Sequence, residues 1–172
     1  MLEENKNLVR FDYEEILNKK NLDAIEQIFT GDTLFRAPNM PEARGYEGRR
    51  QLVLAIYKAF PDVCYTIQDL IAEGDKVVAH WSVTGTHEGE WLGVKPAGRT
   101  LSGSGISIFR ITEGKIAEEL VQFDALGQLQ QLSPPPSPRR SKPKPKPKAK
   151  PKKKAKVAKS KPAPKAKKRT RR

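Results

Sequence analysis

The position of Glu119 in the sequence suggests a role in acid–base chemistry. It shares one face of a predicted strand with Val121 and Phe123 through two-residue alternation. A carboxyl group in apolar surroundings has a raised pKa and can remove and return protons near neutral pH. Glu119 is therefore a candidate catalytic acid or base. The alternative is a carboxylate at a rim that reaches water or pairs with a base such as Lys115, because Glu is rarely fully buried.

Two aspartates are further candidates for acid–base chemistry. Asp12 interrupts the apolar side of a predicted helix between Val9 and Ile16, so it either reaches a pocket or lies exposed at the helix edge. Asp124 stands where the last predicted strand becomes a helix. An Asp at that place is typical of an N-cap, because its oxygen accepts free backbone N–H groups.

Four other side chains have both a functional and a structural interpretation. Arg36 either grips an anionic ligand at a pocket mouth or is a surface arginine. Trp91, in a Gly-rich loop, is either a lid or a loop anchor. His87 is expected to make a hydrogen bond within its loop. His80 is expected at a subunit contact or in solvent.

Cofactor chemistry finds no support in the sequence. The two histidines lie on different predicted faces, and the single cysteine, Cys64, has no second thiol for a disulfide or a Cys-rich metal site. We expect Cys64 to be buried as a small hydrophobe. Dinucleotide and phosphate-loop motifs are absent. We therefore expect neither a metal nor an organic cofactor.

The elements that must position these residues follow from hydrophobic periodicity. Apolar residues at helical spacing predict helices around residues 9–17, 22–29 and 52–60, and residues 33–36 suggest a strand or turn. The period then changes to two, which predicts strands at residues 65–72, 76–86, 100–111 and 115–123, joined in part by tight hairpin turns. Helices followed by antiparallel strands predict an α+β domain.

Alternation sorts the side chains of the predicted sheet into two faces. Both faces are rich in large apolar residues: Val77, Ala79, Trp81, Val83, Ser107, Phe109 and Ile111 on one side, and Val78, Ile106 and Ile108 on the other. The helices can cover only one face, and monomers seldom leave extensive apolar patches exposed. We therefore expect a homodimer or a higher homo-oligomer.

Charge divides the chain into a domain of residues 1–132 and a tail of residues 133–172. The domain has 14 basic and 20 acidic side chains, whereas the tail has 19 basic residues and no acidic or aromatic one. Such a composition predicts a disordered thread, similar to linker-histone tails, that binds nucleic acid without sequence preference. Its cations are Arg139, Arg140, Lys142, Lys144, Lys146, Lys148, Lys150, Lys152, Lys153, Lys154, Lys156, Lys159, Lys161, Lys165, Lys167, Lys168, Arg169, Arg171 and Arg172.

Several motifs of the domain resemble one known family. They are Ala59-Phe-Pro-Asp, Asp69-Leu-Ile-Ala-Glu-Gly-Asp, Gly85-Thr-His-Glu-Gly-Glu-Trp-Leu-Gly and Gly105-Ile-Ser-Ile-Phe-Arg. In order and spacing they resemble the SnoaL-like polyketide cyclases, also called ester cyclases. The resemblance implies a nuclear transport factor 2-like fold: a cone of three helices against a curved antiparallel sheet, open into an apolar pocket and usually assembled as dimers.

The resemblance also implies a site, from which this sequence departs. The cyclases close a ring by an intramolecular aldol step without a cofactor, and their last strand carries a His-x-Asp pattern that lines up with Glu119 and Val121. Two further family histidines line up with Ser107 and Arg36. The pocket residues expected on this basis are Tyr13, Arg36, Trp81, Trp91, Ser107, Phe109, Val121 and Phe123.

Two functions remain open from the sequence. One is a SnoaL-like enzyme or binder of a small apolar, oxygenated ligand, with a tail that localises it. The other is a non-catalytic dimeric module that presents basic tails to DNA or RNA. The start of the chain is too acidic for a signal peptide, and no apolar run suits a membrane span. We therefore expect a cytoplasmic protein. The basic tail suggests a nucleoid or nuclear location as alternatives.

Overall fold

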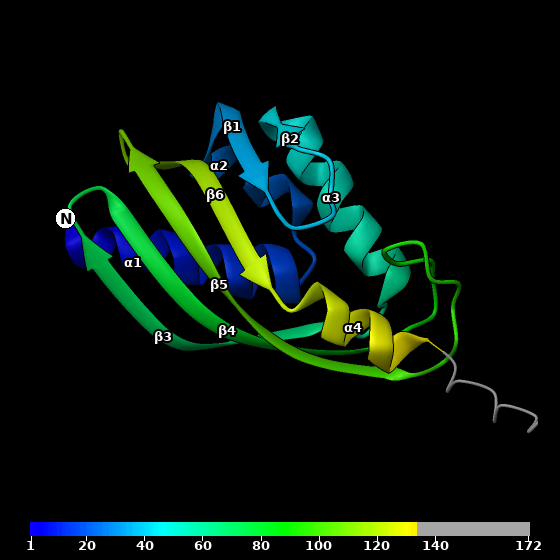
Figure 1. Cartoon of the computed structure of the whole chain (residues 1–172). Helices are drawn as coiled ribbons and strands as arrows, with labels where there is room; N and C mark the ends of the chain where they lie inside the picture. Colours follow the sequence, from blue (N-terminus) through cyan, green and yellow to red (C-terminus); the bar gives the residue numbers. More distant parts are fainter. Residues whose placement is uncertain (134–172) are drawn as a thin grey trace, which may run out of the picture. The chain divides into compact units, whose positions relative to one another are not determined.

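A six-stranded curved sheet, with helices against one face, makes up the part of the chain that the computed structural model describes, residues 1–133 (Figure 1). The predicted disordered tail, apart from its first residue, lies outside the described residues. The strands are β1 (Phe29–Arg36), β2 (Ala43–Arg44), β3 (Cys64–Glu73), β4 (Lys76–Thr86), β5 (Thr100–Thr112) and β6 (Lys115–Phe123), in the spatial order β2-β1-β6-β5-β4-β3.

The sheet is mixed, which corrects the expectation of a purely antiparallel one. Strand β1 runs parallel to β6, with Phe35 opposite Glu119, while all other neighbours are antiparallel. The suggested strand or turn at residues 33–36 is the end of β1, which begins at Phe29. The parallel pair joins the start of the domain to its last strand.

Strands β4 and β5 follow the alternation read from the sequence. The predicted inner residues of β4 and β5 are buried, and Ile106 and Ile108 on the opposite face are exposed. The turn between β5 and β6 is the predicted tight hairpin: Glu113 and Gly114 have φ values of 51° and 71°, as a type I′ turn requires. The outer face of the sheet therefore remains apolar.

The helical elements differ from the expected three. They are α1 (Leu2–Phe11), a π-helical segment at Asp12–Asn18, a 3₁₀ turn at Leu22–Ala24, α2 (Ile25–Ile28), α3 (Gly45–Ala59) and α4 (Ala125–Leu132). The second expected helix is the 3₁₀ turn followed by the short helix α2, and it ends at Ile28 because Phe29 already belongs to β1.

The hydrophobic core lies between the inner face of the sheet and the helical layer. Helix α1 packs against β3 and β4, and α3 packs against β1 (Figure 1). Buried side chains from every layer, including Val9, Val53, Phe109 and Ile116, form one continuous cluster. In residues 1–133, no helix is long and apolar enough to cross a membrane.

Candidate functional site

A pocket opens between α3, the inner face of the sheet, α4 and the loop after β4. Its lining is mostly apolar and aromatic, and it encloses about 690 Å³ of empty space, counting the part open to solvent. Of the residues expected there, the following line it: Tyr13, Trp81, Trp91, Ser107, Val121 and Phe123. The charged side chains in its wall are Arg49 and Glu119.

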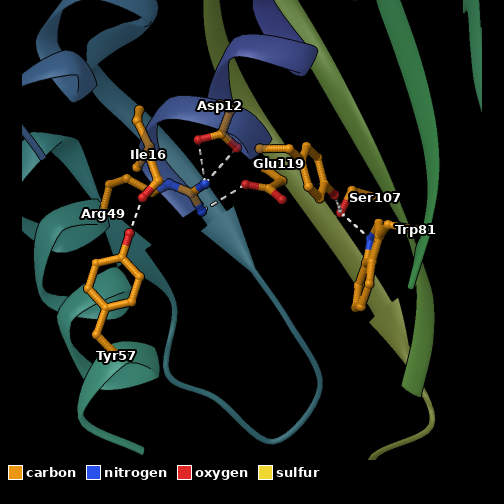
Figure 2. A network of polar contacts seen from close by, with 8 residues as sticks. Asp12, Ile16, Arg49, Tyr57, Trp81, Ser107 and Glu119 are labelled. Atoms are coloured by element: carbon orange, nitrogen blue, oxygen red, sulfur yellow. Dashed lines mark hydrogen bonds and ion pairs between the residues drawn. The ribbon is translucent and has the colours of Figure 1, made fainter. Parts of the chain in front are cut away.

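Arg49 lies between two buried carboxyl groups (Figure 2). Its Nη2 donates to Oδ1 and Oδ2 of Asp12 at 2.8 and 2.7 Å, and its Nη1 lies 2.9 Å from Oε2 of Glu119. The side chains of Asp12, Arg49 and Glu119 are 0%, 3% and 5% exposed. The guanidinium group also lies over the rings of Phe29 and Phe35. We call these three charged residues the acid–arginine–acid triad.

Each member of the triad is placed by the local pattern of its own element. Asp12 begins the π-helical segment on the face that buries Tyr13 and Ile16. Arg49 lies on the buried face of α3, one helical turn before Val53. Glu119 shares the inner face of β6 with Val121. The hydroxyl of Tyr57 on α3 donates to the carbonyl of Ile16, which ties α3 to the π-helical segment (Figure 2).

Ser107 is a second polar point in the pocket wall. Its Oγ accepts hydrogen bonds from the Tyr13 hydroxyl at 3.2 Å and from Trp81 Nε1 at 3.0 Å (Figure 2). Because these two donors occupy its oxygen, Ser107 can donate its own hydroxyl hydrogen to an acceptor in the pocket, and it acts on Glu119 in this way.

Burial raises the pKa of Glu119 to about 7. The positive charge of Arg49 opposes this rise, the negative charge of Asp12 adds to it, and the hydroxyl of Ser107 lowers the pKa. Burial also raises the pKa of Asp12, against the effect of Arg49. For Arg49, burial would lower the pKa, but the two carboxylates outweigh it and hold the guanidinium charged. Glu119 can therefore gain or lose a proton near neutral pH.

The structure corrects the rim and edge interpretations of the two buried acids. Glu119 is buried and contacts Arg49, whereas Lys115 donates to the backbone carbonyl of Glu26. Asp12 is fully buried instead of lying exposed at the helix edge. An apolar helix face can accept a carboxylate here because a buried cation is opposite to it.

Two of the expected pocket residues lie elsewhere. Arg36 is exposed, pairs with Glu42 at 2.8 Å and does not line the pocket, because alternation in β1 turns Phe35 inward and Arg36 outward. Phe109 is fully buried in the core and packs edge-on against Tyr13 instead of lining the pocket.

The remaining candidates have structural surroundings. Asp124 is the N-cap of α4, as expected, and accepts from the backbone N–H of Gly127 at 2.8 Å. His80 is exposed and lies 3.1 Å from Asp69. Cys64 is exposed, so the prediction of a buried cysteine was wrong.

The loop after β4 contains two aromatic residues that pack on Phe60. Trp91 is half-buried, and its indole N–H donates to Gln128 of α4 at 3.3 Å. His87 is fully buried beside Phe60. Its backbone N–H donates to the carbonyl of Arg99, which is a hydrogen bond within the loop as expected, and neither ring nitrogen has a partner among residues 1–133.

Arg49 is the site residue that sequence reasoning missed. The signal was its spacing, since it lies three and seven residues before Leu52 and Ile56 on the apolar face of the predicted third helix. A cation at such a position requires a buried anion. Asp12, which interrupts another apolar helix face, was the matching signal.

Comparison with known proteins places this α+β domain in one family. The sequence model of the SnoaL-like polyketide cyclases matches residues 7–132. The chain therefore belongs to the SnoaL-like polyketide cyclase family, and its fold is the nuclear transport factor 2-like fold.

Individual relatives agree with this membership. Aklanonic acid methyl ester cyclase DnrD of Streptomyces peucetius is 33% identical over 96 residues, which are 55% of this chain and 66% of that protein. TsrD of Streptomyces laurentii has a TM-score of 0.69 at 29% identity, covering 76% of this chain and 96% of the other. A SnoaL-like protein of Jannaschia sp. CCS1 shares the fold with a TM-score of 0.73 at 22% identity, covering 78% and 94%.

Replacing Arg49 by Met should destabilise the domain by about 3–5 kcal/mol at pH 8, because two buried carboxylates lose their cation. The loss should be smaller at pH 5. A carboxyl group with a raised folded-state pKa destabilises the folded protein at pH values above that pKa, where the group is ionised. This destabilisation disappears as the pH falls through the pKa and the group takes up a proton. Urea unfolding at both pH values measures the difference.

Arg50→Met on the same helix is the matched control, because Arg50 has only a 3.8 Å contact with the exposed Asp23. It should change the free energy of unfolding by less than about 1 kcal/mol. Equal effects of the two substitutions, or a loss for Arg49→Met that is independent of pH, would contradict the assignment of a buried triad.

Proposed function

We propose that the domain catalyses a cofactor-independent ring closure on a small, apolar, oxygenated substrate, with Glu119 as the acid and base. The observation that carries the proposal is the position of Glu119: a pocket-facing carboxyl group whose pKa is raised to about 7. Family membership and the relative DnrD, an aklanonic acid methyl ester cyclase, suggest the reaction class.

Glu119 takes over from the family's His-x-Asp pair in this proposal. The position expected for the aspartate is Val121, which cannot transfer a proton, and Glu119 lies two residues earlier on the same strand face. A general base works best when its pKa is near the working pH. The raised pKa of Glu119 meets this requirement with one residue.

The proposed reaction is an intramolecular aldol addition. Glu119 removes a proton alpha to one carbonyl of the substrate, and the resulting enolate carbon attacks a second carbonyl carbon to form the C–C bond. The new alkoxide then takes the proton back from Glu119, so the product is an isomer of the substrate. The hydroxyl hydrogen of Ser107, which favours ionised Glu119 in the free protein, is donated in this proposal to a substrate oxygen beside the enolate.

The pocket wall favours a flat apolar substrate. Phe60, Tyr65 and Trp81 supply aromatic surface, and Trp91 stands at the loop between pocket and solvent. Such a lining excludes water from the reacting atoms and keeps the electrostatic contacts within the pocket strong.

Glu119→Gln should lower the rate of proton removal by a factor of about 10² to 10⁴, because the amide cannot act as a base. The measurement is hydrogen–deuterium exchange at the alpha carbons of 2-tetralone and of aklanonic acid methyl ester, followed by NMR in D₂O. For the unmodified protein the exchange rate should rise with pH through about 7 as Glu119 ionises.

Glu118→Gln is the control for this experiment. Glu118 is the preceding residue of β6, but it points to the outer face and pairs with Arg110 at 2.7 Å. The Glu118→Gln variant should catalyse the exchange of these protons at the rate of the unmodified protein. Exchange by Glu119→Gln at that same rate, or no catalysed exchange by the unmodified protein, would overturn the proposed acid–base role.

The second candidate function is a dimeric module that presents basic tails to nucleic acid. It is supported by the charge asymmetry of the chain, a domain of formal charge −6 beside a tail with 19 cations. The homodimer is supported by the exposed Ile106, Ile108 and Leu120, which form an apolar area on the outer face of the sheet.

Binding of duplex DNA by the full chain should fall by about 10³ to 10⁵ between 50 and 200 mM salt, if 6 to 10 phosphates are engaged. A chain ending at residue 132 should not bind. Changing both Ile106 and Ile108 to Asp should yield a monomer in sedimentation and weaken binding, because two linked tails bind more tightly than one.

Leu126→Asp is the control for the isoleucine changes, because Leu126 is an exposed apolar residue of α4. It should leave both the sedimentation coefficient and the DNA affinity unchanged. Salt-independent binding, or full binding by the chain without its tail, would contradict the second function.

A further inference from the structure

The two acids of the triad differ in what they contact. Asp12 accepts two hydrogen bonds from Nη2 of Arg49 and does not line the pocket. Glu119 lines the pocket, and its Oε2 lies near Nη1 of Arg49 without an aligned hydrogen bond. One carboxyl group is therefore sealed against the guanidinium, while the other is open to a ligand.

We propose that Asp12 is a positioning residue: by holding Nη2 of Arg49 with both carboxylate oxygens, it leaves Glu119 as the acid that exchanges a proton with the pocket. This inference rests on the proposed function, because it assigns the proton to the residue that would transfer it. Asp12 itself touches no ligand in this scheme and acts through Arg49.

Charge balance in the site supports this division of roles. The guanidinium supplies one positive charge, so two ionised carboxylates would leave a net charge of −1 among side chains that are at most 5% exposed. A buried uncompensated charge is costly, and taking up a proton removes it. The proton therefore belongs to one member of the acid pair.

Among residues 1–133, no other side chain near the pair can take this role. The ionisable groups that face it are Tyr13 of the π-helical segment, Tyr57 of α3 and Tyr65 of β3, and burial raises the pKa of all three, so they stay neutral. The facing side chains of β1 are Phe29 and Phe35. The remaining polar neighbour, Ser107 of β5, does not titrate in this range.

Hydrogen bonding decides which acid keeps the proton. A carboxylate that accepts two charge-assisted hydrogen bonds is stabilised in its ionised form. Asp12 has both of these bonds, whereas Glu119 has one ion-pair contact with Arg49 and the smaller effect of the Ser107 hydroxyl. Asp12 therefore remains the anion that neutralises Arg49, and its charge in turn disfavours ionisation of Glu119.

The test is a carboxyl ¹³C NMR titration of the full chain, with the signals of Asp12 and Glu119 assigned from Asp12→Asn and Glu119→Gln. In the unmodified protein Glu119 should titrate near pH 7, and Asp12 should ionise at lower pH. In Asp12→Asn the positive charge of Arg49 is no longer shared with a second carboxylate, so Arg49 stabilises ionised Glu119 more strongly. The proton affinity of Glu119 should therefore fall by about tenfold or more, which is one pKa unit.

Asp23→Asn and Asp12→Glu are the controls for this titration. Asp23 is an exposed acid 3.8 Å from Arg50, so its replacement should leave the titration of Glu119 unchanged. Asp12→Glu keeps the charge and should keep the pKa of Glu119 near that of the unmodified protein.

Two outcomes would overturn the inference. One is an unchanged or raised pKa of Glu119 in Asp12→Asn. The other, which needs only the unmodified protein and Glu119→Gln if Asp12→Asn does not fold, is a titration in which Asp12 holds the proton near pH 7 and Glu119 ionises first. Neither measurement uses a substrate, so both are independent of the exchange assay that tests the proposed function.

Discussion

The single positive charge of Arg49, held between two buried acids, is the interaction on which the rest of the site depends. Arg49 is 3% exposed and contacts Asp12 and Glu119 within 2.9 Å. Because one cation cannot balance two anions, the site retains an exchangeable proton in an apolar pocket. The same imbalance links the stability of the domain to its proposed chemistry, because removal of Arg49 would leave both acids buried without a counter-charge.

The fold brings these three residues together from distant parts of the chain. Asp12 follows α1, Arg49 lies on α3, and Glu119 lies on β6, next to the parallel strand β1. The parallel pairing places Phe35 opposite Glu119, so an aromatic ring lies beside both the carboxyl group and the guanidinium. The topology of the sheet therefore supplies the apolar surroundings that raise the pKa of Glu119.

Local patterns predicted part of this arrangement. Two-residue alternation correctly placed Trp81 and Ser107 on the buried face and Ile106 on the exposed one, because β4 and β5 each have a single periodic pattern. It could not reveal that β1 pairs with β6, since that contact joins segments more than 80 residues apart. Arg49 was missed for a related reason: a charged residue on an apolar helix face is explained only by its partners on other elements.

The most direct measurement of the central claim is an infrared difference spectrum of the full chain between pH 8 and pH 6, compared with that of Glu119→Gln. The account predicts a C=O band of a protonated carboxyl group that appears with a midpoint near pH 7 and is missing from Glu119→Gln. A band that appears only below about pH 5, the ordinary range of glutamate, or one that persists in Glu119→Gln, would contradict it.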